Sequence, residues 1–339
     1  MTKRLTYIDI ARGIAIICIV LGHLGNNTIN RVVFTFHVPI FFFITGYFTT
    51  AKLPIKNFIN NKFKTLIIPY ICTCCIIIFL GTLKAFLGDG IHNALDAFIN
   101  WLYASFYGAG DSYTNPFYIK GIGAIWFLLA TFWGSIFLRL SLNFKESLRM
   151  LTIIILFIIG HVSSTIIWLP FSIQAGMCAS LFMYIGFLFK QVKSNFHLFY
   201  PETKHFMTIF ALVTWLSFIK NFKSFWLVHC DIGRGIIDIF GCICACYIIL
   251  LFSKFIEKHF FFLNKCLSCL GRYSIFMLCV HIIELDLFPW SSFLQRILPL
   301  NTSSTIYLCV LILCKFLLII PCTILCTRLQ FTRKLFSIK

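Results

Sequence analysis

The stretch YIDIARGIAIICIVLGH, at residues 7–23, is largely apolar yet contains Asp9, Arg12 and His23. With its flanks it forms an apolar segment at about 7–25, and roughly 18 such residues mark a membrane-spanning helix. Two basic residues precede it, as in a signal peptide, but no small-residue cleavage site is evident. We therefore expect a permanent transmembrane helix at the start of the chain.

The remainder of the 339 residues extends this pattern, because 60% of them are hydrophobic and 12% are charged. A soluble domain has about 25% charged residues and could not bury so much apolar surface. The sequence predicts an all-α integral membrane protein with about ten transmembrane helices, in a single domain over residues 1–339. The predicted segments lie at about 7–25, 32–50, 66–87, 122–140, 150–169, 172–190, 206–221, 233–252, 270–291 and 304–327.

The formal net charge of +18 comes mainly from Lys and Arg residues in the loops between these segments. Lys and Arg gather in alternate loops, and the loops on the other side hold few basic residues. The positive-inside rule then places both termini in the cytoplasm. The positive charge is thus explained by membrane topology, so we expect no binding to nucleic acid, and the bilayer is the expected partner. The basic residues of the outer loops are Arg31, Lys120, Lys220, Lys223 and Arg296. The longest outer loop is expected at about 88–121.

Sixteen cysteines are present, most of them inside apolar segments, where a thiol behaves as a small buried hydrophobe. Cys266 and Cys269 form a CxxC in a loop, but no second pair or histidine cluster follows at zinc spacing. We expect no disulfide framework and no metal site.

The three ionisable residues of the first segment share one helix face. At about 100° per residue, Arg12 and His23 point within about 20° of each other, about 16 Å apart along the axis. Inserting each such residue into the bilayer raises the free energy by about 2.5–3.5 kcal/mol, so each is expected to have a structural or functional role. Asp9 and Arg12 can form an i, i+3 salt bridge that lets the helix enter the membrane, or belong to a site. His23 is a candidate general base or an interfacial hydrogen-bonded side chain.

Residues 7–23 and FHVPIFFFITGYF, at 36–48, resemble the N-terminal signature of the family 3 membrane acyltransferases, an arginine followed by ten residues and a histidine. GIGAIWFLLA at 121–130 and YSIFMLCVHIIE at 273–284 are similar to two later motifs of that family. The resemblance covers nearly the whole chain. Members commonly O-acetylate bacterial surface sugars, which implies a multi-pass protein of the bacterial cytoplasmic (inner) membrane.

The resemblance implies roles for the first helix. His23 would remove a proton from the acceptor hydroxyl, or receive the acyl group itself. Arg12 would hold a phosphate of acetyl-CoA or another acyl-CoA, and Asp9 would fix Arg12. The acceptor would be a glycan or a lipid-linked sugar. The pantetheine arm of the donor would connect the inner phosphate site with the outer reactive site.

Five further residues are candidates for substrate binding. Lys62 and Lys64 stand where many relatives have two arginines, and lysine cannot make the bidentate contact of arginine. His37 lies near His23 if the first two helices form a hairpin, or is a wet interfacial histidine. Trp126 belongs to a substrate platform, or to the aromatic belt or core. His281 joins the site or pairs with Glu284, which we interpret as structural.

Two other functions remain open from the sequence. Ten helices with buried Asp, Arg and His also describe a transporter or flippase. The absence of an evident internal repeat and the clustering of charge on one helix argue against it. A non-catalytic protein of polysaccharide export is the third interpretation.

Overall fold

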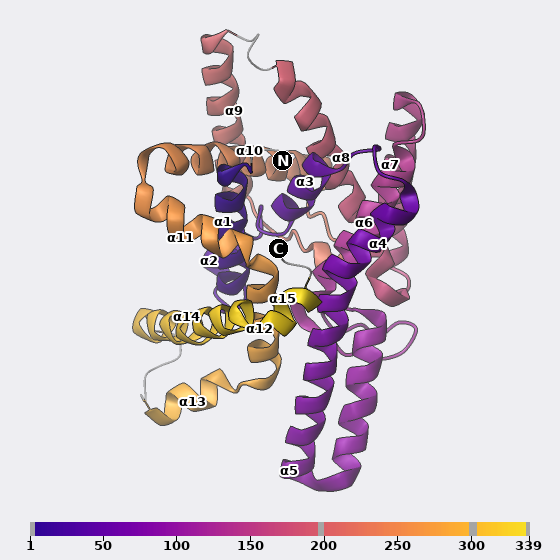
Figure 1. The fold of residues 1–339 in the computed structure, drawn as a ribbon, viewed down its shortest axis with the longest axis vertical. Coiled ribbons are helices and arrows are strands. Elements are labelled where there is room, and N and C mark those ends of the chain that lie inside the picture. Colours follow the sequence, from indigo (N-terminus) through magenta and orange to yellow (C-terminus); the bar gives the residue numbers. More distant parts are fainter. Residues whose placement is uncertain (1–3, 196–199, 298–303, 337–339) are drawn as a thin grey trace.

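The computed structural model describes residues 4–195, 200–297 and 304–336, and it shows a helical protein (Figure 1). Helices take up 81% of the described residues, and no strand forms among them. An isolated antiparallel bridge joins Tyr113 and Ile119 in a connecting loop. The predicted all-helical membrane class is confirmed.

The α-helices follow one another in the order α1 Thr6–Gly22, α2 Asn27–Val33, α3 Pro39–Phe48, α4 Ile55–Lys62, α5 Ile68–Tyr107, α6 Trp126–Ser141, α7 Glu146–Ser164, α8 Ile173–Asn195, α9 Pro201–Lys220, α10 Ile236–His259, α11 Phe261–Arg272, α12 Ser274–Leu287, α13 Trp290–Ile297, α14 Thr305–Arg328 and α15 Gln330–Leu335. A π-helical turn, Phe63–Ile67, joins α4 to α5. Shorter 3₁₀ turns lie at Gly123–Ile125, Pro170–Ser172 and Leu227–His229.

Six helices of the described chain are long and apolar enough to cross a membrane. A seventh span arises if α11 and α12, which are bent by 70° at their junction, count as one. Helix α1, with 17 residues, and α3, with 10, are shorter than the length needed for this count. The ten spans and the cytoplasmic termini stay predictions. The six long spans are Ile55–Gly88, Gly123–Ser141, Glu146–Ser164, Pro170–Val192, Ile236–His259 and Thr305–Arg328.

Helix α1 packs against α11 backbone to backbone. A Cβ atom on Gly13 would lie 2.1 Å from the carbonyl oxygen of Leu267, and one on Gly271 would lie 1.7 Å from that of Asp9. No side chain fits at either glycine, so the two helices approach as closely as their backbones allow. This contact fixes the end of α1 that carries Asp9 and Arg12.

The predicted helix at 32–50 is split in two. Residues 34–38 form a turn between α2 and α3, and Pro39 begins α3, because proline has no N–H to donate and fits the first turn of a helix. Gly46 then packs against α8, where a Cβ would lie 1.7 Å from the carbonyl oxygen of Met183. Gly46 therefore allows α3 and α8 to pack closely.

The prediction of an outer loop at 88–121 is wrong for residues 88–107, which are helical. Gly90 has φ 83° and breaks α5, so that the chain folds back as a helical hairpin (Figure 1). Ala94, Trp101 and Ala104, at helical spacing, are buried along the returning half. The tyrosine hydroxyl of Tyr70 donates to the carbonyl of Ser105 at 2.6 Å, which joins the two halves. The sequence prediction missed this helix because its apolar face is interrupted by polar residues.

Candidate active site

His23 is the first residue beyond α1, and its ring hydrogen bonds fix which nitrogen carries the proton. Nδ1 lies 2.7 Å from the carbonyl oxygen of Ile19. A carbonyl oxygen accepts but cannot donate, so Nδ1 bears the hydrogen and Nε2 keeps a free lone pair. The side chain of His23 therefore has a basic nitrogen available for a ligand.

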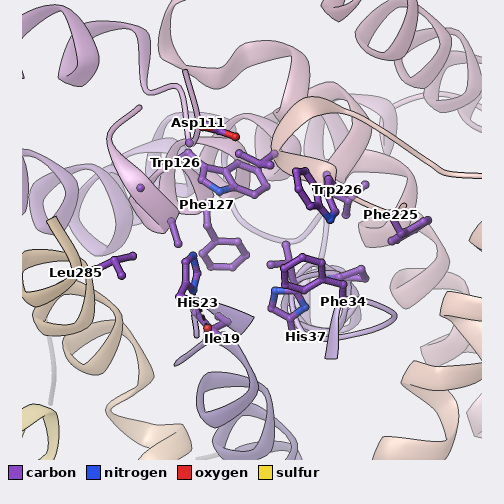
Figure 2. A pocket seen from close by; sticks show the side chains of 17 residues that line it. Ile19, His23, Phe34, His37, Asp111, Trp126, Phe127, Phe225, Trp226 and Leu285 are labelled. Atoms are coloured by element: carbon purple, nitrogen blue, oxygen red, sulfur yellow. Dashed lines mark hydrogen bonds between the residues drawn. The ribbon is translucent and has the colours of Figure 1, made fainter. Parts of the chain in front are cut away.

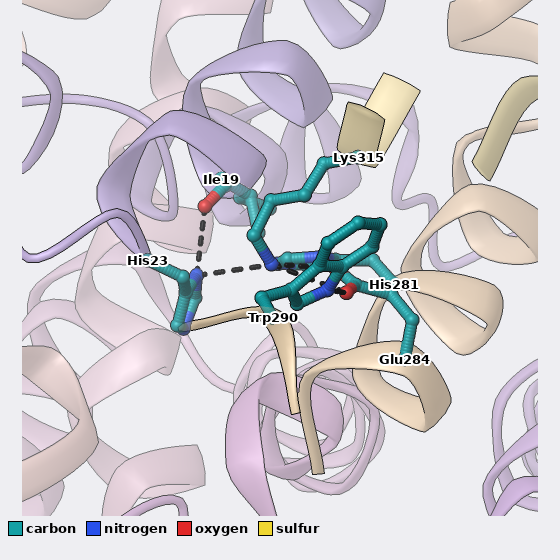
Figure 3. Close-up of polar contacts among 6 residues, drawn as sticks. All are labelled: Ile19, His23, His281, Glu284, Trp290 and Lys315. Atoms are coloured by element: carbon teal, nitrogen blue, oxygen red, sulfur yellow. Dashed lines mark hydrogen bonds and ion pairs between the residues drawn. The ribbon is translucent and has the colours of Figure 1, made fainter. Parts of the chain in front are cut away.

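His281, on α12, extends this arrangement to a second element. Its Nδ1 donates to Oε1 of Glu284 at 2.8 Å, which leaves Nε2 as an acceptor. That Nε2 lies 3.4 Å from Nδ1 of His23, and the two rings meet edge to face with centroids 5.1 Å apart (Figure 3). The Nδ1–H of His23 thus points to both the Ile19 carbonyl and His281. Glu284, His281 and His23 form one hydrogen-bonded chain.

Glu284 is buried, and its negative charge is balanced by Lys315 of α14. Nζ of Lys315 lies 2.9 Å and 3.1 Å from the two carboxylate oxygens, and Trp290 Nε1 also donates to the carboxylate (Figure 3). Glu284 is 4% exposed and Lys315 is 2% exposed. A buried carboxylate with three donors is held in one orientation, and it in turn holds His281. Through His281, Glu284 therefore also helps to fix the orientation of the His23 ring.

His23 also lines a cavity of about 330 Å³, which we call the aromatic cavity (Figure 2). Phe34, Trp126, Phe127 and Trp226 supply rings to its wall. A small cavity with aromatic walls and few polar groups is a typical small-molecule site, and aromatic faces stack on sugar rings.

Two polar groups face the aromatic cavity besides His23. His37 donates from Nδ1 to the carbonyl of Val33 at 2.7 Å, so its Nε2 is a free acceptor. The ring of His37 stacks on Phe34 with centroids 4.9 Å apart. Asp111 is the second group, and His229 Nε2 lies 3.2 Å from its carboxylate.

The loop that carries Asp111 is tied down by Tyr113. Its hydroxyl donates to the carbonyl of Val228 at 3.0 Å, and its ring stacks on Trp168 with centroids 4.3 Å apart. Burial raises the pKa of Tyr113, so the phenol stays a donor. The loop at 108–122 is thereby held against residues 226–230, beside the aromatic cavity.

The other end of α1 carries a cationic cluster. Arg4 Nε donates to Asp9 Oδ2 at 2.5 Å, while Arg12 Nη1 lies 3.9 Å from Asp9 Oδ1. Arg12 is partly exposed, lies 6.0 Å from the ring of Phe48, and its charge repels that of Lys62. One carboxylate among three cations leaves an excess of positive charge here, which suits an anionic ligand.

The predicted residues thus fall into two groups. The first consists of His23, His37, Trp126 and His281, which lie at or beside the aromatic cavity. The second consists of Asp9, Arg12 and Lys62 at the opposite end of α1. Lys64 is exposed and, within the described residues, makes no ion pair. The chemical roles of all eight residues stay predictions.

From the sequence, two alternatives remain for His281, which either joins the site or pairs with Glu284. The structure shows the pair with Glu284 and, in addition, a contact with His23. Lys315 was not singled out, although a lysine in the middle of an apolar segment is the signal that should have found it. Arg4, and not Arg12, is the nearer partner of Asp9.

The cysteines remain free thiols in the structure. All sixteen cysteines lie in the described part of the chain, and none is in a disulfide. Over the same residues, no three His, Cys, Asp or Glu side chains are placed to hold a metal ion.

Comparison with known proteins places the chain in a family. The sequence profile of an acyltransferase domain matches residues 5–326, which is nearly the whole chain. No curated protein and no solved structure matches it. Because the matched region contains α1 and α12 and most of α14, it includes every residue of the Glu284–His281–His23 chain. The chain belongs to the family 3 acyltransferases, and the protein is therefore a membrane acyltransferase.

Proposed function

We propose that the protein is an O-acyltransferase of the bacterial cytoplasmic membrane. It transfers an acyl group, acetyl in the first place, from acyl-CoA to a hydroxyl of a surface or lipid-linked glycan. The observation that carries this proposal is the hydrogen-bonded chain from Glu284 through His281 to His23, which ends at the aromatic cavity. A basic nitrogen oriented by a second group and facing a small-molecule cavity is the arrangement that a general base needs.

In the proposed reaction, His23 Nε2 takes the proton of the acceptor hydroxyl. The hydroxyl oxygen attacks the thioester carbonyl carbon, a C–O bond forms, and the C–S bond breaks. The proton passes from His23 to the departing CoA sulfur, so the products are an O-acyl glycan and CoA thiol. His281 and Glu284 position His23 through their hydrogen bonds.

The acyl donor is placed along α1. Arg12 and Lys62 bind CoA phosphates at one end of the helix, and Asp9, which Arg4 already neutralises, keeps Arg12 in position. Arg12 and His23 are about 16 Å apart along a helix axis, a span that the extended pantetheine arm can bridge. Holding an extended donor between two fixed points supplies catalysis by positioning.

The acceptor is placed in the aromatic cavity. A sugar ring stacks on one of the aromatic faces, and its hydroxyls hydrogen-bond to the free Nε2 of His37 and to Asp111. These contacts bring one hydroxyl to His23. Trp126 is part of the wall against which the ring lies.

Reconstitution tests this function. The purified chain in liposomes, given radiolabelled acetyl-CoA on one side and surface glycan on the other, should move label onto the glycan. Absence of transfer, together with movement of glycan across the membrane without any acyl donor, would instead identify a transporter or flippase.

Substituting Arg12 by lysine tests the donor site. Lysine keeps the charge but loses the bidentate contact with phosphate, so the KM for acetyl-CoA should rise about tenfold with kcat nearly unchanged. Asp9 keeps its contact with Arg4, so the fold should survive. Arg333, which is exposed on α15, provides the matched control, and Arg333→Lys should leave KM unchanged. An Arg12→Lys variant with wild-type KM would remove Arg12 from phosphate binding.

A further inference from the structure

A second cavity, of about 390 Å³, adjoins the aromatic cavity, and we call it the polar cavity. It lies between α2 and the segment that follows α9. Its lining includes Asn30, Arg31, Phe222 and Lys223, together with Phe34 and Trp226, which also line the aromatic cavity. The two cavities therefore share part of their wall.

The polar cavity has two cations and no acid. Arg31 and Lys223 line it, no Asp or Glu does, and neither cation makes an ion pair within the described residues. Arg234, by contrast, pairs with Asp238 at 2.5 Å. The outer loops of the predicted topology hold few basic residues, yet two of them meet here. Such a pair attracts an anionic group, and the arginine can bind it bidentately.

Asn30 supplies an independent observation. Its side-chain Oδ1 is buried and has no hydrogen-bond partner among the described residues, which is costly for a polar atom. Because Asn30 lines the polar cavity, its carboxamide is placed to bind a ligand hydroxyl. The assignment of oxygen and nitrogen in the carboxamide does not matter, because a hydroxyl both donates and accepts. The cavity therefore suits a ligand with hydroxyl groups as well as negative charge.

The shared rings connect this cavity to the reactive one. Phe34 and Trp226 meet edge to face with centroids 6.0 Å apart, and Phe34 stacks on His37. A ligand that lies across these rings has one part beside Arg31 and Lys223 and the other beside His37 and His23. Two neighbouring saccharide residues meet this description.

We propose that the acceptor is an acidic glycan, whose carboxylate or phosphate is bound in the polar cavity by Arg31 and Lys223. The residue that is acylated occupies the aromatic cavity, and the anionic group belongs to its neighbour in the glycan. This proposal rests on the acyltransferase function proposed above, and it adds the charge of the acceptor.

Binding of a matched pair of disaccharides tests the proposal. The probes are glucuronosyl-glucose and its carboxyl-reduced counterpart, titrated into the full chain in phosphatidylcholine nanodiscs at low salt. The acidic disaccharide should bind about tenfold more tightly, because a charge-assisted contact is worth about one factor of ten. Arg31→Ala should abolish this preference and Lys223→Ala should reduce it. Lys220, which has the same charge but does not line the cavity, is the control, and Lys220→Ala should keep the preference.

Equal affinities for the two disaccharides, or an unchanged preference in Arg31→Ala, would overturn the proposal. Repeating the titration in nanodiscs that contain phosphatidylglycerol tests whether the polar cavity binds a lipid headgroup instead of a glycan. Loss of the preference for the acidic disaccharide in these nanodiscs would show that the cavity binds headgroups, and it would also overturn the proposal. The binding measurement needs no acyl donor. Acyl transfer to neutral acceptors without acid preference would refute the acidic acceptor alone, whereas acid-selective binding without acyl transfer would refute the enzyme function alone.

Discussion

Replacing His23 by alanine is expected to lower acyl transfer by about 10²- to 10⁴-fold, the usual contribution of a general base. The variant removes the nitrogen that faces the aromatic cavity and also the partner of His281. The ring makes its hydrogen bond to a carbonyl one turn earlier in the same chain segment, so its loss should not prevent membrane insertion. The measurement is the initial rate of label transfer from acetyl-CoA to glycan in purified membranes, with the amount of inserted protein determined alongside.

His205 provides the matched control for this substitution. Its Nδ1 donates to the carbonyl of Pro201 at 2.8 Å, the same contact, four residues back, that His23 makes with Ile19. It is exposed on α9 and lines neither cavity, so His205→Ala should keep the wild-type rate. A His23→Ala variant that is as active as His205→Ala would show that no base is needed at this position.

Replacing Lys315 by methionine is expected to destabilise the protein by about 3–5 kcal/mol, the cost of leaving one partner of a buried ion pair alone. Glu284 would keep its contacts with His281 and Trp290 but lose the positive charge that lies within 3.1 Å of both its oxygens. The thermal unfolding midpoint in detergent should fall clearly. Acyl transfer should fall as well, because the orientation of His281 depends on Glu284.

A double variant separates charge from packing. Adding Glu284→Gln to Lys315→Met removes the unpaired charge, so most of the lost thermal stability should return while acyl transfer stays low. Lys258→Met, at an exposed position near the end of α10, should leave the midpoint unchanged. A Lys315→Met protein that melts like the wild type would mean that Glu284 is not held as a carboxylate by this lysine.

The spacing of Arg12 and His23 could be predicted from the sequence, whereas the partners of His23 could not. The two residues are eleven positions apart, so helical periodicity alone predicts that they share one face. The contact of His23 with His281 joins residues 258 positions apart in the chain. This contact depends on the 70° bend between α11 and α12, and no residue pattern predicted that bend. Family resemblance pointed to His281, but not to the contact.

The misplaced loop has a similar cause. Gly88, Asp89 and Gly90 indicate a turn, but they do not show that a helix returns beyond it, and a glycine is also compatible with close helix packing, as Gly46 illustrates. The choice between a turn and a packing contact depends on what lies opposite the glycine. Nothing lies within 4 Å of a Cβ on Gly90, whereas the backbone of Met183 lies against Gly46.

In the proposed reaction, His23 catalyses transfer of an acyl group to a cell-surface or lipid-linked glycan. Mass spectrometry of surface polysaccharide tests it most directly, in cells that lack the gene and carry either the wild type or His23→Ala. With the wild type we expect glycan heavier by one acyl group per modified residue, and with the variant we expect unmodified glycan. Identical masses from the two strains would contradict it.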